Sequence, residues 1–377
     1  MGVIRLMLAF GVLLAHIEHQ IMPAVHAHAD FRLTFGIIGG HSVLWFYVVS
    51  GFLMSTVLDT KYGRDTTGTI AFFKARALRI FPLWIAIFLF CAIVIAPSGG
   101  ASWITQHSPL DIVRALVLVG QDWRLIFSDY PKPNWSVFAP ASEVSWTLGA
   151  ELTFYLIAPF VLRSRRWCAF LFLTSVCIRI GVIALTAPGS VDRVTWNYFF
   201  FPSTLCFFLL GHLSRFITGK LPNAAGFVLL AAALSCSFPL GLDPSRPFDN
   251  PWFYAATLLF AGALPGVFTA SKDLRASNFL GDLTYPLYLV GNICLASLFA
   301  TWSWRVSDLG AALLHIAASI TDDLTRGYVI TALVAGFALL VAMIVRFVVE
   351  VPATAILRRR LFGPTLPSGD TLSKEVA

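Results

Sequence analysis

The chain has 377 residues, of which 57% are hydrophobic and 12% are charged, and its mean hydropathy is +0.77. A soluble domain carries about 25% charged residues, so this composition excludes a water-soluble protein and indicates an integral membrane protein. The net charge of +7 is therefore interpreted as a signal of membrane topology, and we expect no nucleic-acid partner.

Ten apolar runs approach or exceed the length of about 20 residues that a helix needs to cross a bilayer. They are residues 3–22, 40–58, 77–96, 146–162, 167–187, 198–217, 222–240, 252–270, 283–302 and 328–350. The apolar stretch 109–120 is shorter and carries Asp111 and Arg114, so we expect an interfacial or re-entrant helix there. The pattern predicts an all-α, polytopic membrane bundle of about ten transmembrane helices. Its membrane domain would cover residues 1–360, followed by a disordered cytoplasmic tail over residues 361–377.

The positions of lysine and arginine predict the orientation of these helices. With the N-terminus inside, 17 of the 27 cations flank cytoplasmic helix ends and 8 flank the opposite ends, while Arg179 and Arg346 lie within helices. The positive-inside rule therefore favours two cytoplasmic termini and an even number of helices. Alternatively, residues 1–29 are a signal peptide with Arg5 in its basic region and a cleavage site at the sequence AHA, residues 27–29.

The first run carries two ionisable residues, Arg5 and His16. Eleven residues of helix rise about 16–17 Å and make nearly three turns, so both side chains would share one face. This spacing is typical of a groove with a cation at its mouth and a titratable base further in. The structural alternative is an arginine that reaches the membrane surface and a histidine that bonds a neighbouring helix.

The third run begins with three cations, Lys74, Arg76 and Arg79. Arg76 and Arg79 are three residues apart and share a helix face, which suits bidentate binding of phosphate groups. Anchoring at the cytoplasmic membrane surface explains the same cations without a ligand.

The stretch SWTLGAELTFYLIAP, residues 145–159, places the carboxylate of Glu151 in an apolar helix with Tyr155 one turn later. Such a carboxylate needs a partner, which could be His16, an arginine or a substrate hydroxyl, or simply a neighbouring helix. Ser50 and Gly51 in FYVVSGFL, residues 46–53, allow either close helix packing or a hydroxyl contact to a ligand. The sequence contains no GxxxxGK[ST], GxSxG or HExxH motif, so we predict no metal site and no ATP-driven pump.

Taken together, these stretches resemble the membrane acyltransferase-3 family, which includes bacterial exopolysaccharide and O-antigen O-acyltransferases. Arg5-x10-His16 resembles the family's first-helix Arg-x10-His motif, and FYVVSGFL is similar to its FFVLSGF element. Arg76-x2-Arg79-x2-Pro82 resembles its Arg-x-x-Arg element followed by proline. Three further stretches are similar to family elements: SWTLGAELTFYLIAP, FLGDLTYPLYLVGN at 279–292, and Glu350-Val351-Pro352. The resemblance covers residues 1 to about 360, as expected for the stand-alone type without a fused SGNH domain.

Two positions differ from the family pattern. The polar residue that often precedes FFVLSGF falls at Leu44, with His41 and Ser42 nearby. The histidine that follows YL falls at Gly291, which leaves His16 as the one matched intramembrane histidine and argues against a mechanism that needs two.

The resemblance implies an O-acyltransferase that moves an acyl group, most simply acetyl, from cytoplasmic acyl-CoA to a hydroxyl of an exported or lipid-linked glycan. His16 would be the general base or an acyl relay, because an unperturbed imidazole titrates near ~6.5. Arg5 would hold His16 or the donor, and Glu151 would orient His16 or bind the acceptor. Arg76, Arg79 and Lys74 would bind the CoA phosphates, while Ser50, Trp146 and Tyr155 are the expected substrate-binding residues.

Two other functions remain open at this stage. One is a transporter or flippase for a glycan or small solute that uses His16 and Glu151 as a proton relay. A pair of phosphate-binding arginines and the lack of repeated halves argue against it. The other is a structural subunit derived from the same family. The presence of all five family-like ionisable residues argues against it, namely Arg5, His16, Arg76, Arg79 and Glu151.

Overall fold

The computed structural model describes residues 1–27, 39–95, 108–127, 144–237, 250–299 and 307–362. These residues form helices and turns and contain no strand. The elements are α1 (Gly2–Gln20), α3 (Gly40–Thr60), α4 (Thr66–Phe90), η1 (Cys91–Ile95), α6 (Pro109–Val117), α7 (Gln121–Phe127), α8 (Ser145–Val161), α9 (Arg165–Leu185), α10 (Val191–Val194), η4 (Thr195–Phe199), α11 (Phe201–Ser214), η5 (Arg215–Ile217), α12 (Asn223–Ser237), α13 (Pro251–Ser271), α14 (Arg275–Phe299), α15 (Ser307–Ser319), α16 (Asp323–Val345), η7 (Arg346–Glu350) and α17 (Val351–Phe362). The predicted all-α class is confirmed.

Each of the ten predicted spans overlaps a helix. By length and composition, six described helices could cross a membrane, namely α1, α3, α4 with the start of η1, α9, α13 and the continuous α16–η7–α17. The segments Val191–Phe199 and Phe201–Ile217 meet at 45° and make a seventh if they count as one span. A count of about ten is not confirmed, because α8 and α12 have only 17 and 15 residues and α14 contains polar residues such as Asp282.

Two helices, α15 and α17, lie outside the predicted membrane spans. The helix α15 lies in a stretch where no span was predicted, and it packs against α14 and α16. The helix α17 continues to Phe362, past the predicted domain end at residue 360, and the rest of the predicted tail lies outside the described residues. The short helix expected at 109–120 is present as α6, which is followed by α7 after a sharp turn.

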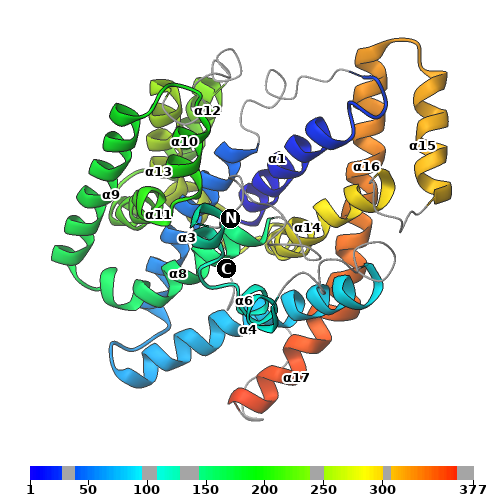
Figure 1. Ribbon diagram of the computed structural model, residues 1–377. Coiled ribbons are helices and arrows are strands. Elements are labelled where there is room, and N and C mark those ends of the chain that lie inside the picture. Colours follow the sequence, from blue (N-terminus) through cyan, green and yellow to red (C-terminus); the bar gives the residue numbers. More distant parts are fainter. Residues whose placement is uncertain (28–38, 96–107, 128–143, 238–249, 300–306, 363–377) are drawn as a thin grey trace.

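The bundle is organised around α3. Figure 1 shows α9, α11, α12 and α13 gathered on one side and α14, α15 and α16 on the other, with α1 and α3 between them. Helices α3 and α11 approach closely, because a side chain at Gly51 or Gly211 would overlap the backbone oxygen of Phe208 or Val48. Trp45 on α3 stacks on Phe260 of α13 at 4.0 Å. These contacts hold one face of α3 against its neighbours and leave the face that carries Ser50 toward α8.

Candidate active site

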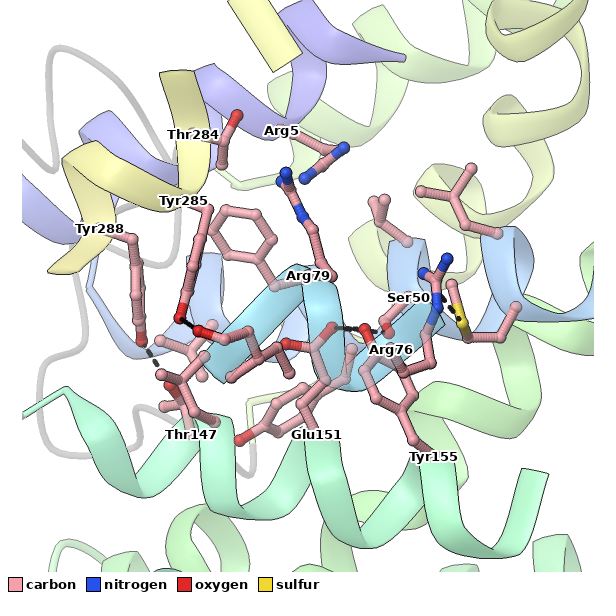
Figure 2. Close-up of a pocket in the computed structure, with 18 residues that line it drawn as sticks. Arg5, Ser50, Arg76, Arg79, Thr147, Glu151, Tyr155, Thr284, Tyr285 and Tyr288 are labelled. Atoms are coloured by element: carbon pink, nitrogen blue, oxygen red, sulfur yellow. Dashed lines mark hydrogen bonds between the residues drawn. The ribbon is translucent and has the colours of Figure 1, made fainter. Parts of the chain in front are cut away.

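A cavity that we call the inner chamber lies between α1, α3, α4, α8 and α14, and its volume is about 110 Å³. Figure 2 shows polar side chains from all five helices directed into it. The polar and charged residues labelled there are Arg5, Ser50, Arg76, Arg79, Thr147, Glu151, Tyr155, Thr284, Tyr285 and Tyr288. Six of the nine residues predicted for the site therefore line this chamber, and the other three do not.

The carboxylate of Glu151 is the centre of one hydrogen-bonded group in the chamber. Its Oε1 accepts hydrogen bonds from Ser50 Oγ at 3.2 Å and from the hydroxyl of Tyr155. Tyr155 follows Glu151 by one helical turn, as the sequence predicts, while Ser50 comes from α3. Two hydroxyl donors on one oxygen fix where the carboxylate of Glu151 points.

The two arginines of α4, Arg76 and Arg79, also line the chamber. The guanidinium of Arg76 lies 5.8 Å from the ring centre of Phe72 and 5.9 Å from that of Tyr155, and its Nη1 contacts the sulfur of Met54. Among the described residues, Nε of Arg76 and Nη2 of Arg79 have no hydrogen-bond partner although both are buried. Both side chains therefore retain donors that a bound anion could use.

A second cavity, which we call the vestibule, has a volume of about 450 Å³ and shares Arg76 and Arg79 with the inner chamber. It lies between α4, α14, η7 and α17. Its lining contains five cations and two acids: Lys61, Arg76, Arg79, Arg346, Arg358, Asp282 and Glu350. A wide cationic cavity and a narrow polar one thus meet at the two arginines.

Ion pairs fix the wall between α4, α14 and η7. Glu350 lies 3.5 Å from Arg79 and 3.4 Å from Arg346, and Arg346 lies 2.5 Å from Asp282. Arg346 and Glu350 are the first and last residues of a π-helical segment, a feature that is frequent at functional sites. This network orients Arg79 from outside the inner chamber.

Three predicted site residues lie elsewhere in the described structure. His16 is partly exposed on α1 and lines neither cavity, although Arg5 on the same helix lines the inner chamber. Lys74 is exposed, with its amine 5.9 Å from the ring centre of Phe362. Trp146 is buried and packs edge-on against Tyr198 and Phe199 at 5.0 and 4.7 Å.

Several chamber residues were not predicted as site residues. Tyr285 donates to the backbone oxygen of Ile80 at 2.8 Å, and Tyr288 lies 2.8 Å from the hydroxyl of Thr147. Both tyrosines belong to the stretch FLGDLTYPLYLVGN, so the family-like sequence already contained the signal. Gly291, where the family often has histidine, packs against α1, and a Cβ there would lie 3.2 Å from Leu13.

The chain is similar to two known proteins and to one protein family. Nodulation protein 10 of Rhizobium leguminosarum bv. viciae is 28% identical over 320 residues, which cover 75% of this chain and 80% of that protein. Acyltransferase MdmB of Streptomyces mycarofaciens is 27% identical over 322 residues, which cover 76% of each chain. No solved structure matches the chain. Residues 1–350 match the family described as Acyltransferase domain. The chain belongs to this acyltransferase family, and it is a membrane acyltransferase.

Proposed function

We propose that the protein transfers an acyl group, most simply acetyl, from cytoplasmic acyl-CoA to a hydroxyl of an exported or lipid-linked glycan such as exopolysaccharide or O-antigen. The observation that carries this proposal is the pair Arg76 and Arg79, which lines both the cationic vestibule and the inner chamber. A donor with a polyanionic nucleotide and a long uncharged arm that ends in a thioester fits two such cavities.

In this proposal the phosphates of CoA bind in the vestibule. Guanidinium groups bind phosphate oxygens through parallel N–H donors, and Arg76 and Arg79 keep buried donors without partners among the described residues. Arg346 and Arg358 add positive charge at the same cavity. The exposed position of Lys74 leaves it a more distant contributor to donor binding.

The thioester end of the donor would then enter the inner chamber. Arg5 lines this chamber and would hold the acyl end of the donor there. Glu151, held by Ser50 and Tyr155, orients the groups around the reacting carbon. The acceptor oxygen forms a bond to the acyl carbon, the carbon–sulfur bond breaks, and CoA leaves as the thiol.

His16 is the proposed general base, as the family resemblance implies, and it lies on α1 outside the inner chamber. It lies eleven residues, or about 16 Å along α1, from Arg5. Its partial exposure leaves the imidazole accessible to a hydroxyl that approaches from the end of α1 near Gln20. A general base must be within hydrogen-bond reach of the proton that it takes. In this proposal the acyl end of the donor therefore extends along α1 beyond Arg5 to reach His16, for direct transfer or for an acyl-His16 intermediate.

The vestibule faces the cytoplasm in this proposal, with the protein in a bacterial inner membrane and both termini inside. The excess of cations at the predicted inner helix ends supports this orientation. Reporter fusions after Arg166, Lys220 and Lys272 should be cytoplasmic, and a fusion at Asn250 should be periplasmic. A periplasmic signal at Arg166 would contradict the orientation.

The decisive experiment supplies radiolabelled acetyl-CoA to either face of sealed membrane vesicles. We expect label in lumenal glycan only when acetyl-CoA meets the cytoplasmic face, with free CoA remaining on that face. Transfer of label from the opposite face would contradict the donor side. Intact acetyl-CoA inside the vesicles without acylated product would show transport of the donor in place of acyl transfer.

A further inference from the structure

A tyrosine of the inner chamber carries a buried hydroxyl that has no hydrogen-bond partner among the described residues. This residue is Tyr47 on α3, which lines the chamber and is 3% exposed. Its ring stacks on Phe208 with the two ring centres 4.4 Å apart, at the place where α3 and α11 approach closely. The packing of the ring therefore fixes the position of the hydroxyl. A buried hydroxyl without a partner costs free energy, so its presence needs an explanation.

Arg76 marks one end of the chamber. Its guanidinium contacts the sulfur of Met54 on α3 and lies 5.9 Å from the ring centre of Tyr155 on α8. These two residues each follow, by one helical turn, a member of the hydrogen-bonded pair Ser50 and Glu151. Helices α3 and α8 therefore run in the same direction along the chamber.

The opposite end of the chamber lies one turn before that pair on both helices. There α3 carries Tyr47 and α8 carries Thr147, while Tyr288 of α14 lies 2.8 Å from the Thr147 hydroxyl. We call these three residues the tyrosine end. Figure 2 shows Tyr288 and Thr147 at one side of the view and Arg76 at the other. Seven residues of α3 separate Tyr47 from the residue that contacts Arg76, so the two ends lie about 10 Å apart.

The tyrosine end also lies toward the proposed general base. Helices α1 and α14 run side by side in the same direction, because a Cβ at Gly281 would be 2.8 Å from Cα of Gly2 and one at Gly291 would be 3.2 Å from Leu13. Tyr288 is three residues before Gly291, so it is level with the middle of α1. An acyl group that moves from the arginines toward the base therefore passes the tyrosine end.

The hydrogens of two of the three hydroxyls at the tyrosine end are already used. Thr147 donates its hydrogen to the backbone oxygen of Val144 at 2.7 Å, so Tyr288 donates its own hydrogen to Thr147. The hydrogen of Tyr47 has no acceptor among the described residues. A ligand that satisfies Tyr47 must therefore present an acceptor, and a carbonyl oxygen is such a group.

We propose that the hydroxyl of Tyr47 donates a hydrogen bond to the carbonyl oxygen of the acyl thioester and stabilises the negative charge that develops on it during transfer. When the acceptor oxygen bonds to the acyl carbon, an electron pair of the carbonyl moves onto this oxygen. When that pair returns, the carbon–sulfur bond breaks, and the proton lost by the acceptor goes to the CoA sulfur. The inference rests on the proposed function, and it adds Tyr47 as a catalytic residue.

The first test detects this hydrogen bond without turnover. Acetyl-CoA labelled isotopically at its thioester carbonyl is bound, without acceptor, to the His16→Ala protein, and isotope-edited infrared spectroscopy records the carbonyl stretch. A hydrogen bond lowers the frequency of that stretch. We therefore expect a higher frequency when Tyr47→Phe is added and the same frequency when Tyr328→Phe, at an exposed position, is added. Equal frequencies with and without the Tyr47 hydroxyl overturn the inference, and this result is expected if Tyr47 binds water or an amide of the donor arm.

The second test measures transfer from acetyl-CoA to the glycolipid fraction extracted from the membranes of the source organism. We expect Tyr47→Phe to lower kcat by about 10²-fold, the effect of removing one donor to a developing oxyanion, with the KM values of both substrates unchanged. Tyr328→Phe should retain the wild-type kcat. A rise in the requirement for the fraction at unchanged kcat would assign the hydroxyl to the acceptor and overturn the inference.

Thermal melts separate this role from a structural one. Tyr47→Phe keeps the ring that stacks on Phe208 and removes a hydroxyl that makes no bond within the described structure, so its Tm should equal or exceed that of the wild type. A variant that loses both Tm and kcat, with the carbonyl frequency unchanged, would show a structural role and overturn the inference.

The infrared result also separates this inference from the proposed function. A frequency that depends on Tyr47, in a protein that transfers no acyl group to the glycolipid fraction, contradicts the proposed function and leaves the hydrogen bond standing. A frequency that does not depend on Tyr47, in a protein with normal transfer, overturns the inference alone. A protein that does not bind acetyl-CoA contradicts both.

Discussion

Ser50 Oγ donates a hydrogen bond to Oε1 of Glu151 across 3.2 Å, which joins α3 to α8 inside the inner chamber. The hydroxyl of Tyr155 donates to the same oxygen. The orientation of the carboxylate therefore depends on two helices, and the chemistry of the chamber depends on how those helices pack.

Replacement of Glu151 with glutamine should lower acyl transfer by about 10²-fold or more, since the isosteric amide removes the charge that the two hydroxyls orient. The loss should appear in kcat and not in the KM for acetyl-CoA, because the proposed donor phosphates bind in the vestibule. Asp192→Asn makes the same chemical change outside the chamber and should retain full activity. A Glu151→Gln enzyme with normal kcat would remove Glu151 from the reaction.

Replacement of His16 with alanine should lower transfer by at least about 10²-fold, the usual scale for a general base, and should leave membrane insertion unchanged. His19→Ala is the matched control, because His19 lies on the same helix and is exposed. Steady-state kinetics of both variants in the same vesicles make the comparison. Normal activity of His16→Ala would exclude a central role for this residue.

Replacement of Arg76 with lysine should raise the KM for acyl-CoA by about tenfold, because an ammonium group cannot form the parallel N–H bonds of a guanidinium. Arg166→Lys, at an exposed position, should leave that KM unchanged. Titration of both substrates separates the effects. A change confined to the KM of the acceptor would show that Arg76 does not bind the donor.

The stability of the protein should depend on pH through Asp122. Burial raises the pKa of Asp122 to about 7, and the nearby backbone N–H groups of Asp122 and Trp123 oppose this shift only in part. An unfolded aspartate titrates near ~3.9, so the folded protein binds more protons than the unfolded chain between these values. The free energy of unfolding therefore falls as pH rises through this window, and the stabilisation is fully present only below it.

Thermal melts in detergent between pH 4 and 8, a range of about four units around these pKa values, provide the measurement. Asp122→Asn should reduce the fall in Tm with rising pH, whereas Asp192→Asn should keep the wild-type slope. An Asp122→Asn protein with the wild-type slope would show that Asp122 does not titrate in this range.

Local sequence patterns were enough to predict most of the helices and the proximity of Glu151 and Tyr155. Tyr155 follows Glu151 by one turn, so their contact depends only on helix geometry. The contact with Ser50 depends on how α3 packs against α8, and no local pattern reports that packing. The same limit explains why Asp282 and Arg346, 64 residues apart in the chain, were not recognised as a pair.

Helical spacing predicts that Arg5 and His16 share one face of α1, but it cannot predict how far a cavity extends along that face. Arg5 and His16 are nearly three turns apart and share a side, but the chamber reaches only Arg5. The depth of a cavity is set by the side chains of neighbouring helices, here including Tyr47 and Tyr288. The spacing of residues within one helix therefore cannot predict the depth of the cavity beside it.

The difference in volume between the two cavities has a consequence for donor choice. If the thioester enters the inner chamber as proposed, the rings and aliphatic side chains around it act as a molecular ruler for acyl-chain length. Val49 and Leu53 line this cavity together with Phe46, and each methylene that does not fit disfavours a longer acyl group. Short acyl groups would then be selected by the space available, while the vestibule accepts the nucleotide of any acyl-CoA.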